Sequence, residues 1–151
     1  MSVKVEGAAE LKRKLLSLGR DMDKALAQGV FITANDIRTD AVKSVQNPSF
    51  GAYVKRSRQG GGTYDHIAAA PGSAPNTDTG KLVNSIAVEM NWNDREAFVG
   101  SNLDYSAFLE FGTTAMDARP FLEPAARENY GNLDKNINKA VMATIQKRSK
   151  K

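Results

Sequence analysis

Residues 78–122 read DTGKLVNSIAVEMNWNDREAFVGSNLDYSAFLEFGTTAMDARPFL. Four apolar residues in this segment alternate with small or polar neighbours: Ile86, Val88, Met90 and Trp92. This alternation predicts a strand with one face toward a core and the other toward solvent. The run Asn93-Asp94-Arg95 has turn chemistry, and residues 96–100 can return as the antiparallel partner, with Phe98 packing across the pair. The segment therefore predicts a central hairpin.

The residues before this hairpin have the chemistry of a helix start. Asp78 or Thr79 can accept hydrogen bonds from free backbone amides and so cap a short helical turn. Leu82 and Ile86 would then point the same way, because residues four apart share a helix face. We expect a short capped helix that leads directly into the first strand.

A second short helix is expected after the hairpin. Asp104 is placed as its N-cap, and Tyr105 and Phe111 lie within it. Gly112 is suited to end this helix, because glycine adopts a left-handed conformation without a steric penalty. A loop should follow, and Pro120 then fits the first turn of a last helix, where its missing N–H has no partner to lose.

Helical periodicities also precede the segment. Val3 and Val5 alternate with polar neighbours, which suits a short strand. A first helix then carries an apolar stripe made of Leu11, Leu15 and Leu18. We expect Gly19 to stop this helix and Asp21 to cap a second, longer one, which ends at Asn47-Pro48.

The last part of the sequence predicts another amphipathic helix. Its apolar stripe consists of Leu133, Ile137, Val141 and Ile145. Gly131 can kink or break the first part of this helix, and a basic tail at 147–151 is expected to fray. Together these patterns predict an α+β fold: a small antiparallel or mixed sheet with a central hairpin, flanked by a long N-terminal helix and a C-terminal helix.

Composition limits the classes of protein. The 151 residues are 41% hydrophobic and 25% charged, which is typical of one globular domain over residues 1–151. The chain has no Cys, so it forms no disulfide or thiolate nucleophile. No apolar run reaches membrane-spanning length, and the first residues lack a signal-peptide core, which predicts a non-exported soluble product. The net charge of +4 permits contact with DNA or acidic proteins but specifies neither.

Residues 48–77 are predicted to form a flexible, basic arm. Glycine and proline interrupt all periodicity there, notably at residues 60–62, and loops of this length are usually functional or disordered. Its cations are Lys55, Arg56 and Arg58. A partial hairpin, with residues 52–54 opposite Thr63-Tyr64, is possible.

The sequence predicts no reaction centre. His66, the only histidine, lies in the arm, where we expect it to be exposed and too poorly framed for a general base. Asp78, Glu110 and Asp117 could pair as carboxylates of a glycosidase or a metal nuclease, but each has a structural role that explains it. We therefore predict no enzyme activity, cofactor or metal site.

Two hypotheses concern charged residues. Arg119 could form a bidentate ion pair with Glu110 or with a carboxylate of a neighbouring chain, and so lock the loop between residues 112 and 120. The cations of the arm could contact nucleic-acid phosphates while Tyr53 and Tyr64 stack on bases. Docking of the arm on an acidic neighbouring subunit explains the same arm residues.

An ordered series of motifs runs through the chain: Val5-Glu6-Gly7, Ala70-Pro71-Gly72-Ser73-Ala74-Pro75, Asp78-Thr79-Gly80-Lys81-Leu82, Ser85-Ile86, Val99-Gly100-Ser101, Tyr105, Leu109-Glu110-Phe111-Gly112-Thr113 and Ala118-Arg119-Pro120-Phe121-Leu122. The series resembles the phage head-to-tail joining (neck) morphogenesis proteins of the gene-product-ten type, from long-tailed phages and prophages. The resemblance covers nearly the whole chain.

The resemblance implies a non-enzymatic virion component with a tail-completion-like fold. Such a protein assembles in the host cytoplasm into a ring, of six copies, between the head-closure or connector protein and the tail terminator or tail tube protein. A ring needs one face to fit a different face of the next copy, and Phe50, Tyr53 and Tyr64 are candidate anchors for that contact.

Double-stranded DNA would pass through the ring without sequence-specific binding. We therefore expect the basic arm and tail to face protein partners or the channel rim, because a dense basic lining would hold DNA too tightly. The alternatives are a tail terminator or minor tail protein, then a basic DNA-binding protein, and last a phage hydrolase or nuclease.

Overall fold

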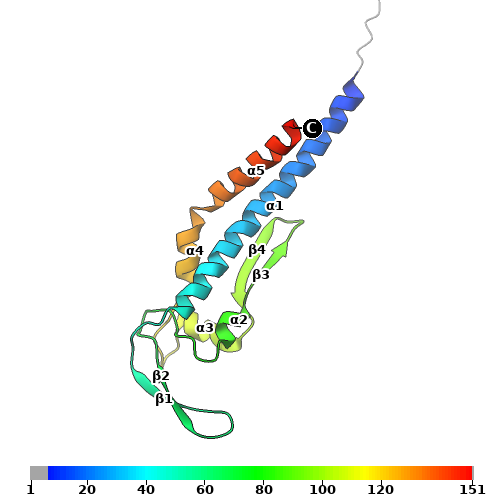
Figure 1. Cartoon of the computed structure of the whole chain (residues 1–151). Helices are drawn as coiled ribbons and strands as arrows, with labels where there is room; N and C mark the ends of the chain where they lie inside the picture. Colours follow the sequence, from blue (N-terminus) through cyan, green and yellow to red (C-terminus); the bar gives the residue numbers. More distant parts are fainter. Residues whose placement is uncertain (1–6, 151) are drawn as a thin grey trace, which may run out of the picture.

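A computed structural model describes residues 7–150. Its elements, in chain order, are α1 (Ala8–Gln46), β1 (Tyr53–Ser57), β2 (Thr63–Ile67), α2 (Lys81–Ser85), β3 (Ile86–Asn91), β4 (Glu96–Ser101), α3 (Asp104–Phe111), α4 (Leu122–Tyr130) and α5 (Leu133–Ser149) (Figure 1). The fold is α+β, as predicted. The strand expected at Val3 and Val5 lies outside the described residues.

The helix α1 is continuous and forms the long axis of the molecule (Figure 1). Its 39 residues give a length of about 58 Å at the α-helical rise. The predicted break is wrong, because Gly19 and Asp21 both lie inside α1. A glycine inside a helix costs only about 1 kcal/mol, which a long helix tolerates. Asp21 is not a cap but pairs with Arg148 of α5, at 3.0 Å.

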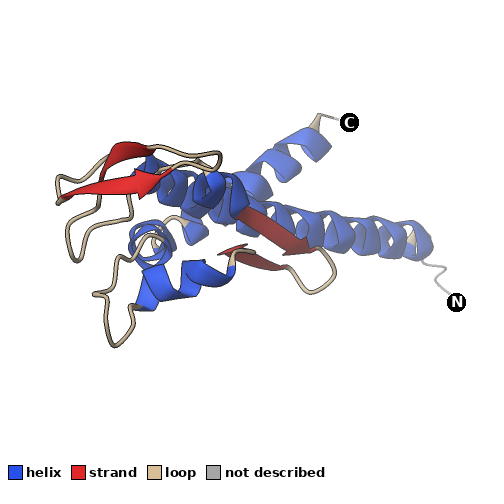
Figure 2. Cartoon of the chain, turned by 90° about the horizontal axis from the view of Figure 1, so that it is seen from below, coloured by secondary structure: helices blue, strands red, loops and turns tan. Residues whose placement is uncertain are grey.

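The predicted central hairpin is confirmed. β3 and β4 pair antiparallel with Val88 opposite Val99, and Ile86, at the start of β3, is buried (Figure 2). Phe98 does not pack toward the core, because it is one residue out of phase with Val99 and is 62% exposed opposite Glu89.

Trp92 departs from the predicted alternation. It lies just beyond the end of β3 and is 55% exposed. Its ring nevertheless lies against Phe31 of α1, with centroids 5.4 Å apart. The tip of the central hairpin is thus fixed on the helix by an aromatic pair.

The best-buried cluster joins three distant parts of the chain. Its members are Ala41, Val45, Leu82, Ile86, Phe121 and Ala125. Leu82 and Ile86 therefore do face the same way, as their spacing predicted. The cluster holds the C-terminal part of α1, the start of the central hairpin and the start of α4 together.

Helices α4 and α5 follow one side of α1 and are separated at Gly131, where the sequence predicted a kink or break (Figure 1). The chain passes Gly131 and Asn132 in right-handed conformations. α5 extends to Ser149, so residues 147–149 are helical and the predicted frayed tail is wrong there. The reason is that Arg148 also donates to the Ser17 hydroxyl of α1, at 2.8 Å.

The contact between α1 and α5 depends on Gly29. A Cβ at this position would lie 2.6 Å from the Cα of Ile137, far inside normal contact distance. Nearby, the Asn136 amide donates to Thr33 and Asp36 of α1, both at 3.0 Å. Gly29 thus lets two backbones approach, and the polar pairs fix their register.

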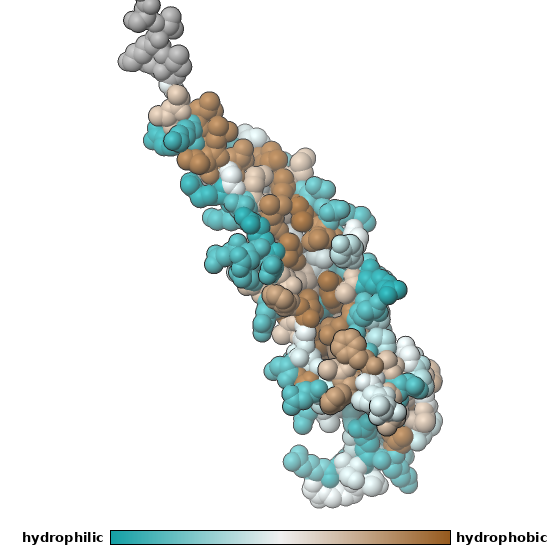
Figure 3. Space-filling view, turned by 180° about the vertical axis from the view of Figure 1, so that it is seen from behind, coloured by the Kyte–Doolittle hydropathy of each residue, from teal (hydrophilic) through white to brown (hydrophobic). Residues whose placement is uncertain are grey.

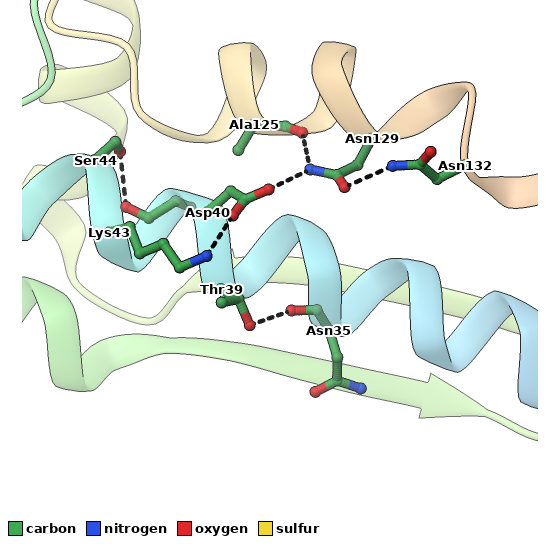
Figure 4. A network of polar contacts seen from close by, with 9 residues as sticks. Asn35, Thr39, Asp40, Lys43, Ser44, Ala125, Asn129 and Asn132 are labelled. Carbon is green, nitrogen blue, oxygen red and sulfur yellow. Dashed lines mark hydrogen bonds and ion pairs between the residues drawn. The ribbon is translucent and has the colours of Figure 1, made fainter. Parts of the chain in front are cut away.

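A polar network joins α1 to α4 (Figure 4). The Asn129 amide donates to Asp40 at 2.8 Å and to the Ala125 carbonyl at 3.0 Å, and Lys43 donates to Asp40 at 3.1 Å. The Asn132 side-chain amide donates in turn to Oδ1 of Asn129, at 3.2 Å. The hydrogen bond from Asn129, with that from Lys43, lowers the pKa of Asp40 below its usual 3.8.

The close approach of α1 and α5 predicts opposite effects at two glycines. Gly29→Ala should lower the free energy of unfolding by about 1–3 kcal/mol, because its methyl group overlaps Ile137. Gly19→Ala, where nothing lies within 4 Å, should raise it by about 0.5–1 kcal/mol. Urea unfolding followed by circular dichroism measures both. Equal changes in the free energy of unfolding for the two variants would contradict the close packing of α1 and α5 at Gly29.

The lowered pKa of Asp40 predicts a pH dependence. The stability that ionised Asp40 contributes is present above pH 3.8 and is lost as the pH falls through the folded-state pKa. Asp40→Asn should therefore flatten the acid limb of a plot of unfolding free energy against pH. The effect should be modest because the side chain is 35% exposed. The control is Asp65→Asn, which removes a carboxylate from an exposed position outside this network, and Asp40→Asn should flatten the limb more than it does.

Candidate functional site

Glu110 is the buried carboxylate that organises the loop between α3 and α4. Its Oε2 accepts from the backbone amides of Phe121 and Leu122, at 2.9 and 3.1 Å, and its Oε1 from that of Glu123, at 2.7 Å. These are amides at the start of α4, which have no partners within the helix. Glu110 thus caps α4 from another helix, and its negative charge suits the positive helix end.

The predicted ion pair between Glu110 and Arg119 is absent from the described residues. Both carboxylate oxygens already accept from amides of α4, which orients them away from this pairing. Arg119 instead donates its backbone N–H to the Leu109 carbonyl, at 2.7 Å. The loop is held not by the predicted ion pair but by this backbone hydrogen bond and by the bonds of the Glu110 carboxylate to α4. Within residues 7–150, the buried Nε of Arg119 has no hydrogen-bond partner.

Gly112 ends α3, as predicted, but with φ 74° and ψ −175° it is extended at positive φ and not in the left-handed helical conformation. A Cβ there would lie 2.8 Å from the Met116 carbonyl oxygen and the Ala118 amide nitrogen, so the loop closes tightly over this residue. Pro120 does not lie in the first turn of α4, which begins only at Leu122 because Glu110 caps it there. Phe121 is 1% exposed and faces the core.

The N-caps predicted for α2 and α3 are wrong. Gly80, with φ 74°, is the cap residue of α2, and neither Asp78 nor Thr79 caps this helix. Leu103 precedes α3, and Asp104 is its first helical residue, where it still favours the helix dipole. In both cases backbone conformation starts the helix without a side-chain cap.

Asp78 instead fixes the arm. Its carboxylate accepts from the Tyr64 hydroxyl at 2.6 Å and lies 3.6 Å from Arg56 and 3.9 Å from Nδ1 of His66. The hydrogen bond to Asp78 raises the pKa of Tyr64 above its usual 10.0. The His66 side chain is only 11% exposed, so the expectation of an exposed histidine is wrong. The His66 side chain lies near Asp78 because β2 turns the face that carries His66 toward the protein body.

The middle of the arm at 48–77 forms a hairpin. β1 and β2 pair antiparallel from Tyr53 opposite Ile67 to Ser57 opposite Thr63, which confirms the hairpin. The predicted register is wrong, because Thr63 and Tyr64 lie opposite Ser57 and Arg56 and not opposite residues 52–54. Residues 60–62 form its tip, and all three glycines have positive φ, at 105°, 98° and 85°. Arg58 lies over the Tyr64 ring, 5.7 Å from its centroid.

Asn76 anchors the base of the arm, a role that the sequence did not reveal. Its Oδ1 accepts from the Ser49 amide at 2.7 Å, and its Nδ2 donates to the carbonyls of Ser49 and Ile67, both at 2.8 Å. Gly51 lies against Ala68 and leaves no room for a Cβ, which would sit 2.2 Å from the Ala68 carbonyl oxygen. An Asn in a polar loop carries no signal of these distant partners.

A cleft of about 380 Å³ lies between the arm, α2 and α3. Its charged or basic lining residues are Arg56, His66, Asp78, Lys81 and Arg119. Tyr105 and Leu109 form part of the α3 wall. Asp78 bonds to Tyr64, whereas Glu110 bonds to the amides of α4, so these two carboxylates are not paired with each other. Among residues 7–150, no group of three or more His, Asp or Glu could hold a metal ion.

Large apolar side chains remain uncovered. Phe50 and Tyr53 of the arm are 85% and 78% exposed, as expected, whereas Tyr64 is partly buried by its bond to Asp78. Phe111, next to the closed loop, is 81% exposed. Near the N-terminal end of α1, Leu11, Leu15 and Leu16 are more than half exposed. Figure 3 shows apolar residues gathered in a band along one face of the molecule.

The fold and its surfaces define a class: an α+β scaffold with an anchored arm and uncovered apolar side chains. The family model described as "Bacteriophage HK97-gp10, putative tail-component" matches residues 9–112, and the chain belongs to this HK97-gp10-like family of phage tail or neck structural components. This is a family of structural proteins and not a known enzyme family. Comparison with curated proteins and with solved structures gave no match.

Family membership indicates a virion protein. Within residues 7–150, no helix combines the length and apolar character needed to cross a membrane.

The cap on α4 predicts a specific loss. Glu110→Ala should lower the free energy of unfolding by about 1–3 kcal/mol, because three amide donors lose their acceptor. Hydrogen exchange of the Phe121 to Glu123 amides should accelerate more than that of α5. Glu123→Gln, which removes only an exposed pair with Arg127, should change stability by less than about 0.5 kcal/mol. A loss no larger than that of the control would contradict the capping role.

Proposed function

We propose that the protein is a neck component that forms a ring and joins the head-closure or connector complex to the tail during phage assembly. Family membership over residues 9–112 is the observation that carries this proposal. The uncovered Phe50 and Tyr53, which are close in sequence in the arm, support it, because neighbouring exposed large apolar side chains mark surfaces for other proteins. We take the ring to contain six copies.

The order of the arm also supports a joining role. Asp78 and Asn76 hold the base of the arm against the body, so the hairpin projects as a preformed element. Preformed contact elements bind with a smaller loss of conformational entropy. Such an arm suits a subunit that must contact its neighbours in one defined register.

The arm cations favour protein contacts over DNA. Arg56 lies near Asp78, and Arg58 lies over Tyr64, so both are committed within the arm. DNA passing through a ring must slide, and each free cation that neutralises a phosphate would slow it. Tail terminator and minor tail protein are alternative roles that family membership supports equally well.

Deletion of the gene tests the joining role. We expect DNA-filled heads and separate, complete tails in electron micrographs of the lysate, because both halves assemble without their joint. Expression of the wild-type gene in trans should restore joined virions. Tails of uncontrolled length would favour the terminator alternative, and normal virions would refute an assembly role.

A DNA-retention assay tests the more distant alternative. At physiological salt, the purified protein should not shift a duplex DNA fragment, since its net charge is only +4 and surface attraction is screened. A lysozyme-like basic protein of higher charge serves as the positive control. Tight, salt-dependent retention of DNA would instead favour a DNA-binding protein.

A further inference from the structure

The cleft between the arm, α2 and α3 contains two cations that the chain itself does not neutralise. Lys81 and Arg119 both line this cleft, and neither forms an ion pair within residues 7–150. Lys81 is exposed, whereas Arg119 is partly buried. Figure 1 shows the arm, α2 and α3 gathered at one end of the molecule. This end therefore presents positive charge in a recess.

The carboxylate of the cleft is already bonded to other groups. Asp78 is the one acidic residue among the lining residues in the described part of the chain. It accepts a hydrogen bond from the Tyr64 hydroxyl at 2.6 Å, and Arg56 and His66 lie 3.6 and 3.9 Å from its oxygens. The two unpaired cations lie beyond ion-pair distance of Asp78. The negative charge of Asp78 thus stabilises the arm and leaves those cations free.

Arg119 is held in place by its backbone, and its guanidinium is partly desolvated. Its N–H donates to the Leu109 carbonyl of α3 at 2.7 Å, and the preceding Ala118 carbonyl accepts from the Gly72 amide at 3.1 Å. Nε of Arg119 is buried and has no hydrogen-bond partner in the described chain. A buried donor without an acceptor costs free energy. An anion bound at the terminal nitrogens would offset this cost, because the guanidinium charge is delocalised over all three nitrogens.

The uncharged lining limits which anion fits. Apolar side chains come from the base of the arm, α2 and α3: Ala68, Ala69, Pro75, Leu82, Tyr105 and Leu109. An apolar wall beside a guanidinium suits a carboxylate on a methylene stem, as in a glutamate side chain. A phosphate of duplex DNA has no such stem, and a recess with two free cations contacts too few phosphates for tight binding. The lining therefore favours a protein carboxylate.

We propose that this cleft binds a glutamate side chain of a neighbouring protein, with the carboxylate on the guanidinium of Arg119 and near the ammonium of Lys81. The methylene stem lies against Leu82 and Leu109. The partner segment is acidic, because the two cations have no counter-charge within residues 7–150. The inference rests on the proposed function for the presence of a neighbouring protein, whereas the binding itself is a property of one chain.

Peptide binding to the purified chain provides the first test. The probe is the tripeptide acetyl-Gly-Glu-Gly-amide, and the same peptide with glutamine in place of glutamate is the uncharged control. The Nε–H of Arg119 gives its own NMR signal, which is assigned by its loss in Arg119→Lys. We expect the glutamate peptide to shift this signal with a Kd on the order of millimolar, and the glutamine peptide to leave it unchanged. No shift, equal shifts with both peptides, or equally tight binding of inorganic phosphate would overturn the proposal.

Removal of the exposed cation provides the second test, which does not disturb buried packing. Lys81→Gln should weaken binding of the glutamate peptide about two- to fivefold, since an exposed ion pair contributes modestly. Arg20→Gln is the matched control, because it removes one positive charge from an exposed position of α1 outside the cleft, and it should leave binding unchanged. Equal effects of the two variants would show attraction by net charge alone and refute a site in the cleft.

The two proposals fail differently. Selective binding of the glutamate peptide together with normal virions after gene deletion would leave the cleft site intact and remove the joining function. Separate heads and tails after deletion, without binding of the peptide, would leave the joining function intact and refute the cleft site.

Discussion

The packing of Val45, Ile86 and Phe121 against one another is the contact on which the rest of the structure depends. These are the largest fully buried side chains among the described residues, and they come from α1, the central hairpin and the segment before α4. Burial of each such side chain stabilises the fold by roughly 1.5–3 kcal/mol relative to leaving it exposed. Because α5 contains no buried residue, this cluster, more than the long pairing of α1 with α5, fixes how the chain folds.

Polar groups around this cluster set the geometry of the surface. Glu110 bonds to the first amides of α4. Asn76 bonds across the base of the arm, and Asp78 bonds to the face of the arm that is turned toward the body. A partly buried polar group bonds in few orientations, so each of these contacts positions a segment more narrowly than apolar packing does. The result is a stiff body from which the arm projects, and the uncovered aromatics lie at defined places on it.

The family match ends at residue 112, but the folded chain continues beyond it through α4 and α5. Glu110 lies within the match, but the amides that it caps belong to α4, beyond it. Likewise Asp40 and Gly29 of α1 contact Asn129 and Ile137 in the last two helices. The segment after residue 112 therefore completes the core of the matched region, since without Phe121 and α4 that core would be open.

The sequence by itself predicted the helices, strands and turns that depend on short-range patterns of residues. Alternation revealed the β3–β4 hairpin, periodicity revealed the helices, and glycine chemistry revealed the end of α3 at Gly112 and the break at Gly131. The same reasoning failed at Gly19 and Asp78. The helix propensity of a glycine differs from that of alanine by only about 1 kcal/mol, and a potential cap residue can bond other groups instead. Contacts with distant residues therefore override both.

Only the tertiary structure decided which partners the polar and small residues have. Asp21 pairs with Arg148, Glu110 caps α4 instead of pairing with Arg119, and Gly29 admits the backbone of α5. These contacts join residues far apart in the chain, so no local pattern encodes them. The sequence by itself thus determined the α+β elements and the family resemblance. Burial and polar contacts between distant segments decided the closed loop and the anchored arm.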